Sequence, residues 1–297
     1  ATIFGQVLSE RRWRRYRVNF LTNHLQWDAF RPGFEARIEA LPQDFAGAME
    51  GLEAVEQARR LMTEYMGIHL LSLLFAHLFY EALDGALRSW VGLEGEAIRS
   101  ALVSDPAENR TLQANKALWG LAQVAETCPA LADRLRAGPA GLEDLEGLPG
   151  WERFGPALDA FLVEFGHRSA ASYEVFATRW ADSPELILGL LSACLRGGDR
   201  QSEDPQAVES RRTEERAHAE RLVRQRMRRT LPRKVLPWRQ ALFSWLLDHA
   251  RKYMALRENQ RFSFDRLLLR TKRILERVGA LLERDGKLDS GESIVFL

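Results

Sequence analysis

The sequence has few of the features that point directly to an activity. It contains two cysteines, Cys128 and Cys194, both in apolar, helix-like surroundings. This usage argues against a disulfide framework and indicates a reducing compartment. Runs in which Val, Ile or Thr alternate with polar residues are nearly absent, which excludes a fold built mainly on β-sheet. No targeting segment is visible.

The short motifs of nucleotide and metal sites are missing as well. There is no Walker glycine–lysine loop and no Gly-x-Gly-x-x-Gly turn between a strand and a helix, so ATP phosphates are not expected to bind in those ways. Glu215 to His218 has the Glu-x-x-His spacing of di-iron sites, but it lies in a highly charged segment and reads as a coincidence, and neither Cys-x-x-Cys nor His-Glu-x-x-His occurs. We therefore expect neither a cofactor nor a metal site in this chain.

Charge of one sign does not prevail. The chain has 42 Lys and Arg against 41 Asp and Glu, so its formal net charge is +1 and gives no global attraction to nucleic acid or to an anionic membrane. Arginine is frequent in 11–17 and 211–229, but helix-spaced apolar residues and neighbouring Glu accompany it. We expect these segments to be helix surfaces and not nucleic-acid sites.

Long hydrophobic runs are also few. The longest, residues 66–80, is broken by His69, Ser72 and His77 and falls short of the roughly 20 residues that span a bilayer. It indicates a buried core helix, and we expect no membrane partner.

The residues that are abundant in the sequence favour helices. Leu, Ala, Glu and Arg dominate, and prolines fall near the proposed helix starts, as at Asp105-Pro106 and Ser183-Pro184. The pattern predicts an all-α, irregular multi-helix bundle. The expected helices cover about 5–30, 44–65, 67–90, 94–103, 108–126, 129–136, 152–165, 184–196, 205–230 and 235–284, the last with a possible break near Asn259.

The domain organisation is predicted from glycine and proline. Residues 138–150 are rich in both and are predicted to connect a helical half, 1–137, to a second half, 151–297. Helix 205–230 is highly charged with a thin apolar stripe, so it is a solvent-exposed arm, which we favour, or it docks along a narrow seam.

The ends of the chain suggest that it is part of something longer. It begins at Ala1 without an initiator Met, and it stops at Ile294–Leu297, a β-prone run with nothing to pair with. We expect a domain excised from a larger multidomain protein, ending at the start of a strand.

Two segments are candidates for ligand contact. In 165–184 small residues are mixed with Arg168, Glu174 and Arg179, which either satisfy one another in a buried loop or contact an anionic or polar ligand. Arg257 and Arg261 are four residues apart and share a helix face, which is either a surface ion-pair face or part of a site.

These segments also resemble a known family. Residues 165–184 resemble the Tyr-Gly-x-Arg…Arg-Trp-x-x-x-Pro motif of the phosphoenolpyruvate-synthase-like enzymes, and the nearest architecture is that of the rifampin phosphotransferases. Three further segments agree in order, and the resemblance covers about residues 105–297. The quoted segments are FGHRS and RWADSP within 165–184, TLQANKALW at 111–119, LRENQR at 256–261, and the helix and expected strand of 275–297.

The resemblance implies a function. Members of that family have an ATP-grasp domain that uses ATP and Mg, a swivelling domain with a phosphorylated histidine, and a central helical domain that holds the acceptor. The chain is similar to that central domain, which implies a cytoplasmic, acceptor-binding part of an ATP-dependent phosphotransferase, a kinase-type transferase working by phosphohistidine relay. Its partners would be a small-molecule acceptor and the two other domains, and no catalytic residue is expected in the chain itself.

Site residues follow from the resemblance position by position. Arg257 and Arg261 match basic positions that line the acceptor pocket, although the family has Lys at the second. Arg168, Glu174 and Arg179 would form another wall. Antibiotic-modifying members carry Gly-Glu-x-Asp where this chain has the Ala170–Glu174 stretch, which argues for an acceptor other than a rifamycin. The alternative is a non-catalytic helical scaffold with 205–230 as a partner-binding arm.

Overall fold

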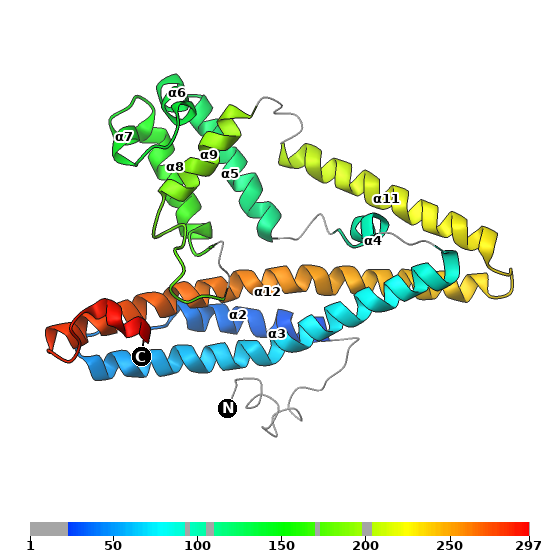
Figure 1. Ribbon diagram of the computed structural model, residues 1–297, viewed down its shortest axis with the longest axis horizontal. Coiled ribbons are helices and arrows are strands. Elements are labelled where there is room, and N and C mark those ends of the chain that lie inside the picture. Colours follow the sequence, from blue (N-terminus) through cyan, green and yellow to red (C-terminus); the bar gives the residue numbers. More distant parts are fainter. Residues whose placement is uncertain (1–22, 93–95, 105–109, 170–172, 198–203, 297) are drawn as a thin grey trace. The chain divides into compact units, whose positions relative to one another are not determined.

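The fold is all-α, as the sequence predicts. A computed structural model describes residues 23–92, 96–104, 110–169, 173–197 and 204–296, and within these ranges it contains ten α-helices, one 3₁₀ helix and no strand (Figure 1). The elements are α2 (Asn23–Glu39), α3 (Ala48–Val91), α4 (Glu96–Val103), α5 (Arg110–Glu126), α6 (Pro129–Ala137), α7 (Glu143–Glu146), α8 (Trp151–Phe165), α9 (Glu185–Arg196), α11 (Pro205–Thr230), α12 (Leu236–Arg284) and η2 (Gly291–Phe296).

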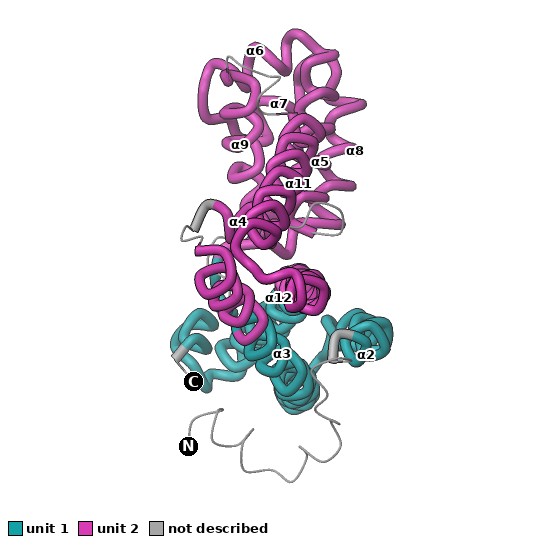
Figure 2. The backbone as a smooth tube through the Cα atoms, turned by 90° about the vertical axis from the view of Figure 1, so that its right-hand side faces the viewer, with its two compact units in different colours: residues 1–77, 171–177, 260–297 teal, residues 78–170, 178–259 magenta. Residues whose placement is uncertain are grey.

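The chain divides into two compact units that are discontinuous in sequence (Figure 2). Unit 1 comprises 1–77, 171–177 and 260–297, and unit 2 comprises 78–170 and 178–259. The long helices α3 and α12 therefore each contribute to both units. The segment 138–150, predicted to connect two halves, lies inside unit 2, where it joins α6 to α8 and contains α7.

Unit 1 is organised around stacked aromatic rings. Tyr65 on α3 packs face to face on Phe264 of α12, with ring centroids 4.4 Å apart and planes 11° from parallel. On its other sides it meets Trp27 and Phe34 of α2, at 6.1 and 5.8 Å. Because helical residues three or four apart share a face, one stripe of α3 supplies this core, with buried residues at 54, 58, 61, 65 and 68.

Unit 2 is a cluster of shorter helices. α5 packs against α6, α8 and α9, and α11 packs against α4 and α5. α11 has the predicted bounds, but it is docked along a narrow seam and not the free arm that we favoured. Ala219, Val223 and Met227 bury one stripe, and Glu220 pairs with Arg251 of α12 at 2.6 Å.

Several helix boundaries differ from the prediction. The expected helices 44–65 and 67–90 are one continuous helix, α3, and α12 runs through Asn259 without a break. Burial of both helices outweighs the weak helix propensity of Gly67 and Asn259. Helix α2 continues past Pro32 to Glu39, while the rest of the helix expected at 5–30 and the Asp105-Pro106 cap lie outside the described residues.

The C-terminal run also differs. Residues 294–296, expected to begin a strand, belong to the 3₁₀ helix η2. A strand needs a neighbouring strand for its backbone groups, and the described residues contain none. The turn leading into η2 is instead closed locally by the Ser293 N–H, which donates to the Ser290 carbonyl at 3.0 Å.

One described helix, α3, has the length and apolar composition that a bilayer span needs. Its most apolar 18-residue window has a mean hydropathy of 1.4 and is 44% buried. A core helix meets the same criterion, and the polar side chains of His69 and Ser72 in this window are buried and hydrogen-bonded within unit 1. We therefore treat α3 as a core helix.

Glycine 279 marks the closest approach of α12 to η2. A Cβ added there would collide with the carbonyl oxygen of Gly291, whereas a Cβ on Gly33 of α2 would meet nothing. Gly279→Ala is expected to destabilise unit 1 by about 2 kcal/mol through overpacking, and Gly33→Ala to stabilise it by about 0.5 kcal/mol by restricting the unfolded chain. Urea unfolding of the two variants checks this, and the same sign for both would contradict the close approach.

Candidate functional site

The start of α5 in unit 2 gathers polar groups from three separate segments. The backbone N–H of Arg110, the first described residue of α5, donates to Asn259 Oδ1 of α12 at 3.3 Å. The neighbouring hydroxyl of Thr111 accepts from Arg168 Nη2 at 3.5 Å. The first turn of a helix carries N–H groups without intrahelical partners and a partial positive charge. These residues therefore form a positively polarised corner, which we call the α5 corner.

The loop that brings Arg168 to this corner is held by its own backbone. Gly166 ends α8, and its carbonyl accepts from the Ala181 N–H at 2.8 Å. The Trp180 N–H donates to the Arg168 carbonyl at 3.0 Å. A Cβ at Gly166 would press against the Ala181 side chain, so glycine permits the close approach of the two arms of the loop.

The side chain of Arg168 is only partly buried. Its guanidinium lies over the Trp180 ring, 5.4 Å from the centroid, and the residue is partly exposed. A guanidinium placed on an indole keeps its planar donor fork in a fixed orientation, which suits bidentate binding of a carboxylate or phosphate. Arg110 adds positive charge at the same helix start, moderated by Glu164 at 3.5 Å.

Arg179 is in a different situation. Its side chain is fully buried, and its Nη1 donates to the His167 carbonyl at 3.0 Å. Its backbone N–H donates to Asp182 Oδ2 at 3.0 Å. These contacts tie together the two arms of the loop that carries Arg168.

The other predicted residues are distributed between the units. Arg257, on the unit 2 part of α12, is 40% exposed and pairs with Glu258 at 3.1 Å, two residues before the Asn259 of the α5 corner. In unit 1, Arg261 lies 3.9 Å from the buried Asp265, and Glu174 is exposed. Within unit 2 the α5 corner thus joins Arg168 to the segment that carries Arg257.

Unit 1 contains a polar network, buried except at Tyr173, that the sequence analysis did not single out. His69 Nδ1 is 2.9 Å from Gln260 Oε1, and Gln260 Nε2 donates to Ser72 Oγ at 2.9 Å. His69 Nε2 is 3.2 Å from the hydroxyl of Tyr173. We call these four residues the His69 network. The available signal was the interruption of the apolar run 66–80 by His69 and Ser72, whose i, i+3 spacing places both on one helix face.

Tyr173 reaches this network from a constrained backbone. Its φ is +74°, in the left-handed region that costs a residue with a Cβ about 1 kcal/mol. The hydrogen bond to His69 and a ring contact with Phe264, at 5.7 Å, hold it there. Beside the network, burial raises the pKa of Tyr65 well above its ordinary value, so its phenol stays neutral.

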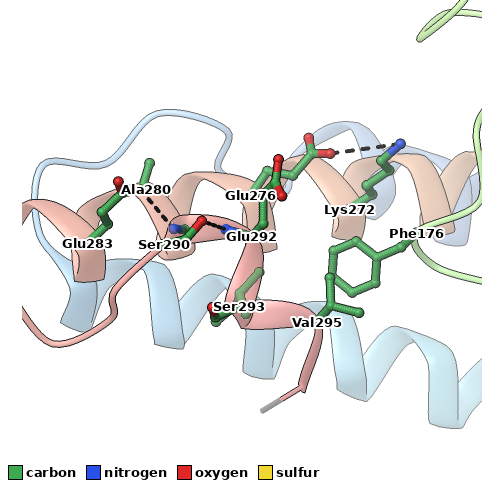
Figure 3. Close-up of a pocket in the computed structure, with 11 residues that line it drawn as sticks. Phe176, Lys272, Glu276, Ala280, Glu283, Ser290, Glu292, Ser293 and Val295 are labelled. Atoms are coloured by element: carbon green, nitrogen blue, oxygen red, sulfur yellow. Dashed lines mark hydrogen bonds and ion pairs between the residues drawn. The ribbon is translucent and has the colours of Figure 1, made fainter.

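A pocket of about 830 Å³ lies elsewhere in unit 1, along the last turns of α12, η2 and Phe176. Figure 3 shows Lys272 paired with Glu276 and Phe176 beside Val295. Lys272 Nζ is 3.8 Å from Glu276 Oε1 and 3.5 Å from the Ala177 carbonyl. The volume falls in the range of small-molecule sites, but the cation of Lys272 is already neutralised within the protein.

Among the residues that the structure describes, no group of three or more His, Cys, Asp or Glu side chains is placed to hold a metal ion. At the α5 corner the described residues include no nucleophile paired with a base. The chemistry that the α5 corner offers is recognition of an anionic or polar group.

Comparisons with known proteins match the part of the chain that contains most of this corner to a family. The family model described as the rifampicin phosphotransferase fourth domain matches residues 69–258. Chondramide synthase cmdD from Chondromyces crocatus is 26% identical over 175 residues, which covers 57% of this chain and 4% of that synthase. The chain thus spans a small part of that curated relative. The family match contains Arg110, Arg168 and Arg257 and all of unit 2 except Asn259, whereas the pocket along α12 and η2 lies mostly outside it.

Proposed function

From the premise that the chain belongs to the rifampicin phosphotransferase fourth-domain family, we propose that it is the acceptor-substrate-binding domain of an ATP-dependent phosphotransferase. The acceptor is a small organic molecule, and its polar or anionic group binds at the α5 corner. Family membership carries this proposal. The corner supports it, because it is the place within the matched residues where Arg168, the start of α5 and the Arg257 segment of α12 converge.

The physical logic is electrostatic. Arg168 supplies a guanidinium fork that is partly exposed and oriented by Trp180, and the first turn of α5 adds backbone N–H groups and dipole. Such fixed donors orient an oxygen of the acceptor or stabilise the charge of an arriving phosphoryl group without reorganisation. Arg257 lies two residues before Asn259 on α12 and pairs with Glu258 at 3.1 Å, so in this proposal it contributes less than Arg168.

The remaining steps belong to other domains in this proposal. The family's description as a fourth domain implies further domains in its members. We place ATP and Mg in an ATP-grasp domain, and the phosphohistidine in a swivelling domain, of the same cytoplasmic polypeptide. This chain would contribute binding and orientation and would not be catalytically complete alone.

The test begins with a thermal-shift screen of the chain against rifampicin, pyruvate, phosphoenolpyruvate and a natural-product library. A ligand that binds the folded state raises the melting temperature by mass action. Arg168→Ala is expected to weaken the hit by roughly 30-fold, because a charge-assisted hydrogen bond contributes about 2 kcal/mol. Arg168→Lys, which keeps the charge but loses the fork, should fall between.

Arg153→Ala, an exposed arginine on α8, is the matched control and should bind like the unaltered chain. A hit that binds equally well to the Arg168→Ala protein would place the acceptor elsewhere. In the whole polypeptide, Arg168→Ala and Arg257→Ala should lower phosphoryl transfer to the acceptor. Unchanged turnover in both would favour the alternative of a non-catalytic helical scaffold.

A further inference from the structure

The second half of α11 and the turn that follows it carry positive charge alone. From Arg221 to Leu247 the sequence has eight basic residues and no Asp or Glu, although the formal net charge of the whole chain is +1. The eight are Arg221, Arg224, Arg226, Arg228, Arg229, Arg233, Lys234 and Arg239. The overall balance therefore hides a strong local segregation of charge in unit 2.

Two of these residues are fixed by the fold. Arg224 Nη2 donates to Ser244 Oγ at 3.1 Å, and its guanidinium lies over Phe243. Arg239 lies over the rings of Trp90 and Trp238, at 5.3 and 5.2 Å from their centroids. Both serve to attach the start of α12 to its neighbours.

The other six are exposed and have no counterion within the part of the chain that the structure describes. None of their side chains makes a hydrogen bond or an ion pair with a residue that the structure describes, and all six are solvent-exposed: Arg221, Arg226, Arg228, Arg229, Arg233 and Lys234. The first half of α11 is different, since Glu209 pairs with Lys116 at 2.5 Å and Glu220 with Arg251 at 2.6 Å. Acidic partners are thus present in the first half of α11, whereas the six exposed basic residues have none among the described residues.

Stabilisation of the helix accounts for only part of the cluster. Cations in the last turn of a helix interact favourably with its dipole, and Arg228 and Arg229 occupy the last turn of α11. Arg233 and Lys234 lie beyond its end at Thr230, and Arg221 lies two turns before it. These three exposed charges therefore have no role in stabilising the end of α11.

An amphipathic aromatic ring accompanies the charges. Trp238 is 50% exposed at the start of α12, and it packs edge-on against Trp90, with ring centroids 6.3 Å apart. Thr230 Oγ1 donates to the Trp90 carbonyl at 2.8 Å, which fastens the end of α11 to the end of α3. The indole is therefore mounted rigidly beside the basic residues.

The basic residues and Trp238 come from one helix end, the turn after it and the start of the next helix (Figure 1). We call this the basic tip. We propose that the basic tip docks on an anionic phospholipid surface, with Trp238 at the depth of the headgroups. Clusters of four to eight Lys or Arg are attracted to the anionic cytoplasmic leaflet, and tryptophan favours the membrane–water interface.

Geometry favours lipid over other polyanions. Four of the six exposed basic residues lie on α11 and two in the turn that follows it, and a bilayer needs no complementary groove. Single-stranded nucleic acid is held by grooves with open aromatic platforms, whereas Arg239 already covers one face of Trp238. The proposal is independent of acceptor binding, because none of these residues belongs to the α5 corner.

The experiment is co-sedimentation of the chain with vesicles of phosphatidylcholine alone or with about one-third phosphatidylserine. Binding is expected only to the anionic vesicles and should weaken as salt rises. The triple variant Arg226→Gln/Arg229→Gln/Arg233→Gln should bind roughly 100-fold less, at about fivefold per charge. The matched control Arg153→Gln/Arg212→Gln/Arg273→Gln removes the same charge from other exposed positions and should bind nearly normally.

Trp238 supplies a second readout. Brominated phosphatidylserine should quench part of the tryptophan fluorescence of the unaltered chain, and Trp238→Ala should lose that component and bind several-fold more weakly. Circular dichroism melting confirms that each variant is folded.

Three results would overturn the proposal. Equal losses in the two triple variants would mean non-specific charge attraction. Competition by inorganic phosphate or glycerophosphoserine at low concentration would mean a site for a free anion. Tighter binding of an oligonucleotide or a glutamate-rich peptide at the same salt concentration would assign the tip to that class. None of these results affects the Arg168 test of acceptor binding.

Discussion

Arg179→Ala is expected to lower the free energy of unfolding by about 4 kcal/mol, because it deletes a fully buried cation together with its hydrogen bonds. The guanidinium donates to the His167 carbonyl at 3.0 Å and has no exposed surface. Its removal leaves that carbonyl without a donor and opens a cavity the size of a large side chain. For a chain of this size the melting temperature should fall by roughly 10 °C.

The control is Arg168→Ala in the same loop. Arg168 is partly exposed and lies over the face of Trp180, so its loss should cost about 1 kcal/mol. We expect Arg179→Ala to impair folding and Arg168→Ala to impair ligand binding. The opposite pattern, in which the Arg179 variant melts normally but loses the ligand, would move Arg179 into the acceptor wall. Thermal melting and the ligand screen together separate the two outcomes.

Gln260→Leu should destabilise unit 1 by about 3 kcal/mol, because it leaves two buried groups without their partner. Gln260 is fully buried and bridges His69, at 2.9 Å, to Ser72, at 2.9 Å. Leucine cannot satisfy either group. Hydrogen–deuterium exchange should show faster opening of the α3 and α12 segments around residues 69 and 260, in step with a lower urea midpoint.

A double variant tests the cause. His69→Leu together with Gln260→Leu removes both partners, so it should recover part of the stability lost by Gln260→Leu alone. An exposed pair provides the baseline: Arg37 donates to Glu64 at 2.6 Å on the surface of unit 1, and Arg37→Ala should cost less than about 1 kcal/mol. Additive losses in the double variant would mean that the network is not a coupled unit.

The helices of this protein were largely predictable from the sequence. α11 has the predicted bounds, and α5, α6, α8 and α9 begin and end within two residues of the expected positions. These helices have local start and stop signals. Gly166 ends α8, and Asp204-Pro205 begins α11, where Asp204 accepts from the Gln206 N–H at 2.9 Å. The missed continuity of α3 at Gly67 has a different source, since burial of the surrounding helix decides it.

The candidate site was only partly predictable. The resemblance to the family indicated both Arg168 and Arg257, and the structure brings the first of them and the segment of the second to the start of α5. Their different roles could not be read from the sequence. Arg179 and Arg168 occur in similar surroundings along the chain, yet one is fully buried and the other partly exposed.

The sequence by itself determined the all-α class, the positions of most helices and the family, because these depend on residue spacing, capping and local motifs. Tertiary structure decided the rest. It paired His69 with Gln260 across 191 residues, docked α11 on its narrow stripe, and left six residues of the basic tip without a counterion among the described residues. Such outcomes depend on which faces of distant helices meet, and neither helical periodicity nor a net charge of +1 records where a side chain lies relative to a partner far along the chain.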